Sequence, residues 1–445
     1  MARLSEPRKG SSQKRRHSGA EKAAEDPSVF DGPSDDAQMD ERSGPPAKKR
    51  RSEPKSAAGE NGDSGELETS KPSALFTPRA GRKWTLSMAV AGSIIANVVE
   101  PKFKTMLAGR IARMAAVFCV DEVVVFDDDP TNIPKYIDPY YKKGKKTKAQ
   151  VLESIVENDE PWQNPDQFLF HVLSYAECPP HLRMDRENPS ANLFPFHQNL
   201  QWAGQLPSLD MPHHLKSHEW CRYREGVTLG PAKSGKSKQA YTYVKCGLPF
   251  PIRIPNEVPP SMRITLKFTD PNQPRSWPHL SQQECENLEV EAVSPAAPRE
   301  EEGYYWGYQV RRAASLSDVF TEPGFQGGYD VSIGTSERGA PLNAVLPKHL
   351  VPSNTKRDGN VAQLPSEFNH LLIVFGGVAG LEPAVATDPE FSKAGLTKET
   401  AHEAFDAWVN LVQGQGSRTI RTEEAVEFGL FGIKSYVDSM YDRHT

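Results

Sequence analysis

The clearest indication of the fold class comes from the segment Leu371-Leu-Ile-Val-Phe-Gly-Gly-Val-Ala-Gly-Leu-Glu382. Its first five residues form a short, continuous apolar run, which is typical of a strand buried on both faces of a parallel sheet. The glycines that follow let backbone groups approach a ligand without obstruction by a Cβ atom. Many α/β strands end in glycine turns, so this stretch alone predicts a parallel sheet with a candidate ligand loop at its edge.

Two further polar glycine loops are candidates for the same edge of the sheet. Upstream, the strand-like run Tyr329–Gly334 leads into Ile333-Gly-Thr-Ser-Glu-Arg-Gly339. Downstream, Gly414-Gln-Gly-Ser-Arg-Thr-Ile-Arg-Thr-Glu-Glu-Ala425 opens onto a final helix from Thr422, which the Thr422 hydroxyl is expected to cap. Three such loops are predicted to line one pocket from the same edge of the sheet.

The sequence between Trp84 and Phe126 shows the same α/β pattern. Thr85 to Val90 predicts a strand, and Glu122-Val-Val-Val-Phe126 predicts a second buried strand. Apolar residues at helical spacing between them predict a helix with one apolar face. Strand, helix, strand is typical of α/β proteins. The residues of that face are Phe103, Met106, Leu107, Ile111, Met114, Ala115 and Phe118.

Between residues 208 and 300 the pattern changes to short strands separated by Gly and Pro. Met262 to Phe268 alternates apolar and polar residues with a period of two, which indicates a strand with one buried face. Several short strands at a spacing of about ten residues predict a small β-barrel or sandwich, inserted into the α/β sequence. The other strand-like runs are Tyr241–Val244, Ile252–Ile254 and Leu288–Val293.

Composition excludes several classes of protein. The 445 residues carry 53 Lys+Arg against 58 Asp+Glu, a net charge of −5, so nucleic-acid contacts must come from local patches. No apolar run reaches the ~18 residues of a membrane span, and residues 1–10 lack the apolar segment of a secretory signal. Five scattered cysteines favour a reducing compartment.

The first 80 residues are rich in Ser, Gly, Pro and charged residues, and this composition predicts disorder. Two basic clusters, Lys14–Arg16 and Pro45–Arg51, are of nuclear-import type, although a solvated charge run is the alternative. We therefore expect the protein to be located in the nucleus or, within it, the nucleolus.

The predicted domain organisation has three components. They are a tail (1–80), an α/β domain in two parts (81–207 and 301–445) and a β insert (208–300).

Two further motifs could indicate a phosphate site and a zinc site, but the sequence around each favours a structural interpretation. Gly230-Pro-Ala-Lys-Ser-Gly-Lys-Ser237 fits the phosphate-binding P-loop, but residues 238–244 are aromatic and β-branched where that loop needs a helix. A basic hairpin loop is the preferred interpretation. A cluster of possible zinc ligands has no second ligand pair, so a surface segment is preferred and no metal is expected. These ligands are His213, His214, His218, Glu219 and Cys221.

The two C-terminal motifs together resemble those of SPOUT-class RNA methyltransferases. They are Val374-Phe-Gly-Gly-Val-Ala-Gly-Leu-Glu382 and Gly416-Ser-Arg-Thr-Ile-Arg-Thr-Glu-Glu-Ala425. The second is similar to the R-x-x-R-T-E-x-A stretch of bacterial small-subunit rRNA uridine-N3 methyltransferases. From Trp84 onward the chain resembles eukaryotic members with an OB-like insert, also through residues 116–126, 305–308 and 334–339.

The resemblance implies a fold, a cofactor and partners. The fold would be an α/β SPOUT methyltransferase with a C-terminal trefoil knot, an exception to the rule against threaded chains, plus the small OB-like β-barrel. S-adenosyl-L-methionine would bind in the knot, RNA (rRNA) would be the substrate, and the protein would be a homodimer. The residues implied for the cofactor pocket are Thr335, Gly376, Gly377, Gly380, Leu381, Gln415, Gly416 and Thr419.

Methylation of a base nitrogen requires positioning and loss of the nitrogen-bound proton. By residue type, Arg338, Arg418 and Arg421 are candidates to neutralise a base anion or hold phosphate, and Glu337 and Glu424 are candidate proton acceptors. A structural ion pair is the alternative for Arg421 and Glu424, which lie three residues apart on a helix.

Four aromatic residues, Tyr304, Tyr305, Trp306 and Tyr308, either stack on bases or pack in a core. The resemblance as a whole implies an S-adenosylmethionine-dependent RNA methyltransferase, with uridine N3 of rRNA favoured. An inactive RNA- or protein-binding adaptor on the same fold and a P-loop nucleotide hydrolase remain as alternatives. The long tail, the insert and the Gly-Val-Ala loop differ from the bacterial relatives, which leaves the target RNA open.

Overall fold

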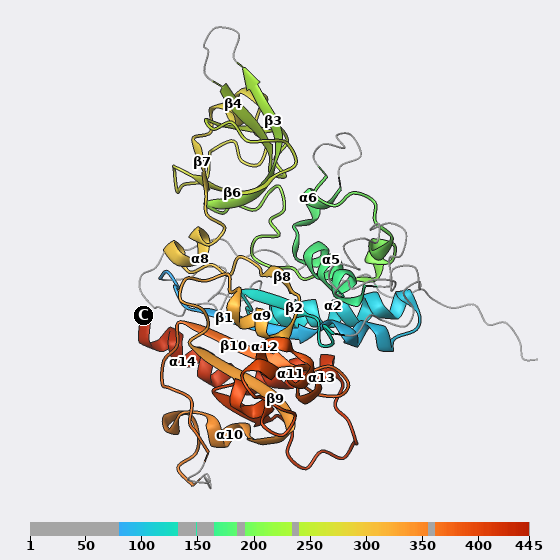
Figure 1. The fold of residues 1–445 in the computed structure, drawn as a ribbon. Helices are drawn as coiled ribbons and strands as arrows, with labels where there is room; N and C mark the ends of the chain where they lie inside the picture. The colour runs from blue at the N-terminus through green and yellow to red at the C-terminus, as the bar shows by residue number, and fades with distance from the viewer. Residues whose placement is uncertain are drawn as a thin grey trace, which may run out of the picture. The chain divides into compact units, whose positions relative to one another are not determined.

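The computed structural model describes residues 80–131, 148, 164–184, 192–233, 240–354 and 361–444 (Figure 1). The described residues begin at residue 80, the last residue of the predicted disordered tail. Both basic clusters therefore lie outside them, and nuclear import stays a prediction. No helix in the described ranges is both long and apolar enough to cross a membrane.

A six-stranded parallel sheet organises the main body of the protein. Its strands are β1 (Thr85–Ala91), β2 (Glu122–Phe126), β8 (Gln309–Ala313), β9 (Val331–Pro341), β10 (His370–Phe375) and β11 (Ala407–Asn410). They lie in the order β11-β9-β10-β1-β2-β8, and every neighbouring pair is parallel. The apolar runs of β1, β2 and β10 occupy the centre of this sheet, which confirms the parallel α/β prediction (Figure 1).

Helices pack against the sheet and against one another. Helix α2 (Pro101–Val117) contacts α5 (Pro165–Glu177) and α13 (Thr422–Gly432), and α13 also contacts β10. The predicted final helix from Thr422 is two helices, because α13 ends at Gly432 and α14 (Lys434–His444) follows Ile433. The shorter α-helices are α6 (Pro180–Arg183), α7 (Gln282–Asn287), α8 (Ala297–Glu302), α9 (Leu316–Thr321), α10 (Leu342–Val345), α11 (Glu382–Thr387) and α12 (Pro389–Lys393). The 3-10 helices are η1 (Gly92–Asn97), η3 (Gln198–Leu200), η4 (Ala203–Gln205), η5 (Lys348–Leu350) and η6 (Ala401–Ala404).

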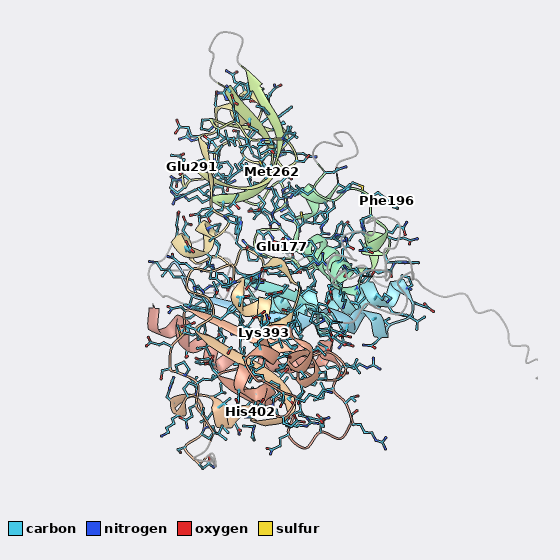
Figure 2. The ribbon with its side chains drawn as sticks, viewed as in Figure 1. Glu177, Phe196, Met262, Glu291, Lys393 and His402 are labelled. Atoms are coloured by element: carbon cyan, nitrogen blue, oxygen red, sulfur yellow. The ribbon has the colours of Figure 1, made fainter. Side chains whose placement is uncertain are left out.

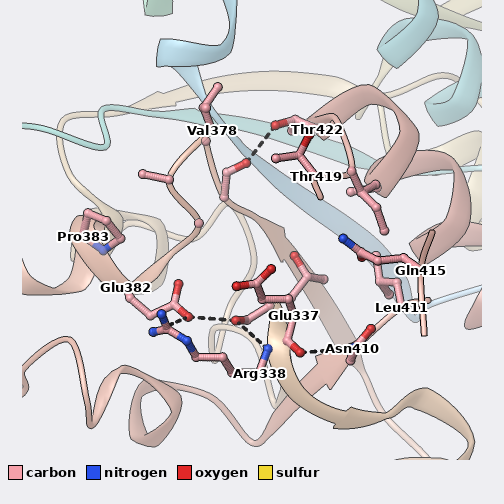
Figure 3. A pocket seen from close by; sticks show the side chains of 18 of the residues that line it. Glu337, Arg338, Val378, Glu382, Pro383, Asn410, Leu411, Gln415, Thr419 and Thr422 are labelled. Atoms are coloured by element: carbon pink, nitrogen blue, oxygen red, sulfur yellow. Dashed lines mark hydrogen bonds and ion pairs between the residues drawn. The ribbon is translucent and has the colours of Figure 1, made fainter. Parts of the chain in front are cut away.

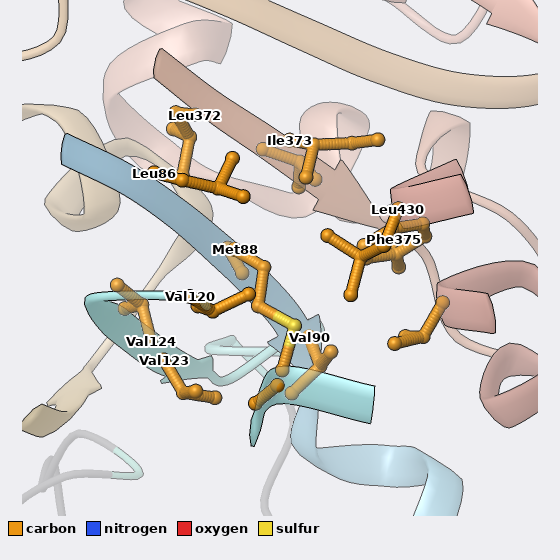
Figure 4. Packing of buried hydrophobic residues seen from close by; sticks show 14 of the residues in the cluster. Leu86, Met88, Val90, Val120, Val123, Val124, Leu372, Ile373, Phe375 and Leu430 are labelled. Carbon is orange, nitrogen blue, oxygen red and sulfur yellow. The ribbon is translucent and has the colours of Figure 1, made fainter. Parts of the chain in front are cut away.

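The core lies on both sides of β1 and β10 (Figure 4). Met88 and Val90 of β1 pack with Ile373 and Phe375 of β10 in one buried cluster, to which Leu430 of α13 also belongs. The Tyr305 hydroxyl donates hydrogen bonds to the carbonyls of Ala115 and Val120 inside this cluster. Together with burial of Trp306 and Tyr308, this supports the core interpretation of these aromatic residues.

The apolar face predicted for the helix after β1 is only partly buried. Ile111 and Ala115 are fully buried, whereas Phe103 and Met106 are exposed. The side chains of α2 that face the core include the small residues Ala108 and Ala112, which the apolar pattern did not single out.

Residues 223–293, which lie between β2 and β8 in the sequence, contain a second sheet, whose strands are antiparallel. Its strands are β3 (Tyr223–Lys233), β4 (Ala240–Lys245), β5 (Ile252–Ile254), β6 (Arg263–Phe268) and β7 (Val290–Val293). They form a curled half-barrel in the order β5-β4-β3-β6-β7, with its own apolar core. Strands β3 and β4 are antiparallel neighbours, so the P-loop-like motif connects a β-hairpin as preferred, although its residues 234–237 lie outside the described ranges.

The half-barrel is joined to the main body by a cluster of ionised side chains around Glu177, at the end of α5 (Figure 2). Arg263 of β6 donates from Nη1 and Nη2 to the Glu177 carboxylate, at 2.5 and 3.0 Å, and from Nε to Glu225 of β3 at 2.6 Å. The indole of Trp306 also donates to Glu225, at 2.7 Å. This cluster links both strands to two segments of the main body.

Candidate functional site

A pocket of about 460 Å³ lies beside the carboxyl ends of β10 and β11 and the second half of β9 (Figure 3). This volume falls within the range of about 300–1,000 Å³ that is typical of small-molecule sites. Most of its lining comes from three segments, 335–338, 376–383 and 410–422, which correspond to the three glycine loops found in the sequence. The carboxyl edge of an open parallel sheet is the usual place for a ligand.

The first segment is a bulge in a strand, where the sequence predicted a loop after one. Ile333 and Gly334 of β9 pair with Ala407 and Trp408, but the next pairs are Ala340–Val409 and Pro341–Asn410. Residues 335–339 therefore have no counterparts on β11 and bulge out beside the pocket. Strands β9 and β11 approach closely at the end of the bulge, since a Cβ on Gly339 would lie 2.4 Å from the carbonyl carbon of Val409.

The second segment is a tight glycine turn after β10. The Gly380 amide donates to the Gly377 carbonyl at 3.0 Å, and Gly380 has a positive φ of 85° that favours glycine. A Cβ on Gly377 would lie 2.7 Å from Ser93 Oγ and 2.8 Å from Asp128 Oδ2. The turn therefore fits against the ends of β1 and β2 only when residue 377 has no side chain.

The third segment runs from the end of β11 to the start of α13. Arg421, and not Thr422, is the N-cap residue of α13. The Thr422 hydroxyl donates to the Gly376 carbonyl at 2.9 Å and so ties α13 to the glycine turn. The predicted capping role of Thr422 is wrong by one residue, because this carbonyl offers its hydroxyl a partner outside the helix.

Charged side chains concentrate at one end of the pocket. Ser336 Oγ donates to Glu382 Oε1 at 2.8 Å, and Arg338 Nη1 lies 3.6 Å from the same oxygen. The side chain of Glu382 is 11% exposed and that of Arg338 is 70% exposed. Arg338 therefore combines an ion pair to Glu382 with access to solvent, so its guanidinium is free to meet an anionic ligand.

The structure places most of the predicted cofactor residues around this single pocket. Leu381 is instead fully buried beneath the glycine turn, and a Cβ on Gly416 would meet open space. The predicted cofactor residues that line the pocket are Thr335, Gly376, Gly377, Gly380, Gln415 and Thr419.

Three of the predicted catalytic residues, Glu337, Arg338 and Arg418, also line the pocket. The carboxylate of Glu424 accepts a hydrogen bond from the backbone N–H of Arg421 at 2.9 Å. This contact stabilises the start of α13. Glu424 thus has a structural partner, which is the Arg421 backbone and not its guanidinium.

Sequence reasoning missed other residues that line the pocket, among them Ser336, Glu382, Lys398 and Asn410. Glu382 is the last residue of the segment 371–382, and a carboxylate directly after a glycine loop could have indicated a pocket residue. The Asn410 amide donates to the Glu337 carbonyl at 2.8 Å and holds the bulge. Its strand β11 has only four residues, too few to show a strand period.

The histidines considered as zinc ligands contact Glu177. His213 Nε2 lies 2.8 Å from Glu177 Oε1, and His214 Nε2 lies 2.6 Å from the Glu177 carbonyl oxygen. Burial lowers the pKa of His214 to about 3. In the described part of the chain, no group of three or more His, Cys, Asp and Glu side chains is arranged to hold a metal ion.

Comparison with known proteins gives one family. Residues 85–433 match a family model described as "Putative RNA methyltransferase". A 28S rRNA (uridine-N(3))-methyltransferase of Homo sapiens is 37% identical over 366 residues, which is 82% of this chain and 82% of that protein. The protein of the same name in Mus musculus is 39% identical over 355 residues (80% and 77%), and that in Drosophila melanogaster 37% over 353 residues (79% and 62%).

Proposed function

The chain belongs to this RNA methyltransferase family, and we propose that it transfers the methyl group of S-adenosyl-L-methionine to N3 of a uridine in 28S rRNA. The observation that carries the proposal is the convergence of the three glycine-containing segments on one pocket. The names of the human, mouse and fly relatives support the choice of nucleotide and RNA.

The pocket residues fit a cofactor of this kind. A Cβ on Gly376 would lie 2.5 Å from the Gly380 carbonyl carbon, within the turn itself, and a Cβ on Gly377 would meet Ser93 and Asp128. Both glycines are thus required for the close packing of a turn whose backbone lines the pocket. Thr335, Gln415 and Thr419 add polar groups around it. S-adenosyl-L-methionine, when bound, supplies an electrophilic methyl group on a sulfonium.

The chain's own residues would handle the proton and the charge of the base. Uridine N3 carries a proton that must leave, and the resulting anion is stabilised by cations. Glu382 is already paired with Ser336 and Arg338, so the exposed carboxylate of Glu337 is the candidate acceptor. Arg338 and Arg418 are the candidates to stabilise the anion.

The trefoil knot and the OB-like character of the half-barrel belong to the same proposal. After β10 the chain passes to β11 at the far edge of the sheet and returns as α13, which packs on β10 and α2. This path supports threading of the C-terminal segment through the chain between β9 and β10. The five antiparallel strands with a separate core support an OB-like barrel.

Calorimetric titration with S-adenosylhomocysteine and, separately, with ATP tests the proposal. We expect saturable binding of S-adenosylhomocysteine alone, and N3-methyluridine in nucleoside digests of 28S rRNA incubated with the protein and S-adenosylmethionine. Absence of binding at millimolar S-adenosylhomocysteine would refute the proposal. Binding without methylation of any RNA would favour the inactive adaptor, and binding of ATP instead would favour a nucleotide hydrolase.

We also propose a homodimer that buries exposed apolar residues of α2 and α13. These neighbouring helices expose Phe103 and Met106 on one and Phe428 and Phe431 on the other. Large apolar side chains gathered on adjacent helices are typical of an interface. The proposal agrees with the partial burial of the apolar face of α2.

Replacement of Phe431 by glutamate is expected to convert the dimer into a monomer, because the charge would have to be buried in an apolar interface. Light scattering during size-exclusion chromatography measures this change. Phe196→Glu is the matched control, since Phe196 is 82% exposed and lies on neither helix. A wild-type monomer at micromolar concentration, or a dimeric Phe431→Glu variant, would contradict the homodimer.

A further inference from the structure

The outward face of the half-barrel carries two tyrosines and an arginine, Tyr241, Tyr243 and Arg253, which we call the tyrosine cluster. Along β4 the side chains alternate: Thr242 and Val244 are fully buried, whereas Tyr241 and Tyr243 are partly exposed. Arg253 is the exposed middle residue of β5, between two buried isoleucines. All three side chains thus point away from the barrel core.

The three side chains lie in contact range of one another. The rings of Tyr241 and Tyr243 are perpendicular, with centroids 5.2 Å apart. Arg253 pairs with Tyr243 across the strands, and its guanidinium carbon lies 5.3 Å from the centroid of the Tyr241 ring. The cluster therefore presents two aromatic rings and one positive charge within a small area.

The neighbouring strand uses its outward face for packing. Val227 of β3 is fully buried and packs with Cys178 and Leu182, and Glu225 accepts the indole N–H of Trp306. This part of the outer face is covered by residues 178–182 and by Trp306. The tyrosine cluster lies on β4 and β5, beyond these contacts.

Charge is distributed unevenly along the half-barrel sequence. Residues 223–254 contain six Lys or Arg against one Glu, whereas residues 264–293 contain two against five Asp or Glu. Arg224 is fully buried, and α7, which carries Glu284 and Glu286, contacts β5, so the exposed positive charge at the cluster is the guanidinium of Arg253. An exposed guanidinium beside two aromatic rings can pair with a single phosphate of an RNA strand whose bases lie on the rings.

We propose that the tyrosine cluster binds a single-stranded segment of the substrate RNA. Unpaired bases stack on tyrosine rings, while Arg253 neutralises a phosphate. A duplex does not fit this chemistry, because its bases are stacked on one another and offer no free face. The inference rests on the proposed function, since it takes RNA as the substrate.

The test uses the full chain and a fluorescein-labelled 12-nucleotide RNA, single-stranded or annealed to its complement, with binding followed by fluorescence anisotropy. The Tyr241→Leu/Tyr243→Leu variant keeps apolar side chains but removes the rings, and we expect at least about tenfold weaker binding of the single strand. The Tyr241→Phe/Tyr243→Phe variant keeps the rings and should bind within about twofold of wild type. Phe250→Leu removes another exposed ring of the same half-barrel and should leave affinity unchanged.

Arg253→Gln should reduce the magnitude of the slope of log affinity against log salt concentration by about 1, the value expected for the loss of one phosphate contact. Equal affinity of the leucine variant and wild type, an equal loss in Phe250→Leu, or preference for the duplex would each overturn the inference. Calorimetry with S-adenosylhomocysteine separates the two proposals. One outcome is that the wild-type protein binds S-adenosylhomocysteine and forms N3-methyluridine while the leucine variant binds RNA as tightly as wild type. This outcome would refute the proposal for the tyrosine cluster and leave the proposed function intact.

Discussion

Replacement of Gly377 by valine is expected to abolish S-adenosylhomocysteine binding, with a loss of affinity of at least about 100-fold. A Cβ at residue 377 would lie 2.7 Å from Ser93 Oγ and 2.8 Å from Asp128 Oδ2, and neither atom can withdraw freely. Ser93 Oγ donates to Asp128 Oδ2 at 2.6 Å, and burial raises the pKa of this Asp128 carboxyl. The turn at 376–380 must therefore move toward the pocket, and overpacking of this kind costs about 1–3 kcal/mol even where a structure adapts.

Calorimetry measures the loss, and Gly416→Ala is its matched control. A Cβ on Gly416 would meet no atom within 4 Å, so this variant should bind S-adenosylhomocysteine within about threefold of wild type. Thermal unfolding by circular dichroism establishes that the Gly377→Val variant is folded. A folded Gly377→Val protein that retains wild-type affinity would show that the turn does not form the cofactor pocket.

The strands of the parallel sheet were the most predictable part of the fold. Glu122–Phe126 and the run from Leu371 to Phe375 are short, continuously apolar and followed by polar or glycine residues, which leaves little choice but buried parallel strands. The glycine segment after the second of these strands could also be assigned to a ligand pocket, because ligands bind at the carboxyl edge of a parallel sheet.

The rest depended on contacts between distant residues. The bulge at 335–339 arises from pairing with β11, a strand of four residues, and neither element shows a period in the sequence. The aromatic residues before β8 look like a strand, but Gly307 has a φ of 82°, and β8 begins only at Gln309. Exposure of Phe103 and Met106 could not be deduced from a helical pattern that makes no distinction between a core and an interface.

Replacement of Glu177 by glutamine is expected to destabilise the protein by about 3–5 kcal/mol, because it removes one partner of a buried ion pair. The side chain of Glu177 is 6% exposed, and its carboxylate accepts two hydrogen bonds from Arg263 and lies 2.8 Å from His213 Nε2. The variant would leave the Arg263 charge with Glu225 alone. Chemical denaturation at pH 7 measures the change in the free energy of unfolding.

Glu390→Gln is the matched control for this effect. Glu390 pairs with Lys393 at 2.6 Å, but both side chains are more than 60% exposed. An ion pair in water contributes about 0–1 kcal/mol, so the control should lie within this range. Equal effects of the two substitutions would show that the Glu177–Arg263 pair does not stabilise the junction between half-barrel and main body.

The pH dependence of the difference between wild type and Glu177→Gln provides a second check. Burial opposes ionisation of Glu177, but the charge of Arg263 and the hydrogen bond to His213 outweigh it and hold the pKa of Glu177 well below its usual range. A carboxyl whose pKa is lower in the folded than in the unfolded state stabilises the fold above its unfolded pKa of about 4.3. Its contribution is lost as the pH falls from there toward the folded pKa. The difference in unfolding free energy should therefore be constant between pH 6 and 8 and shrink below about pH 4. A difference that stays constant down to pH 3 would mean that glutamine weakens packing at this position and that the charge of Glu177 contributes nothing.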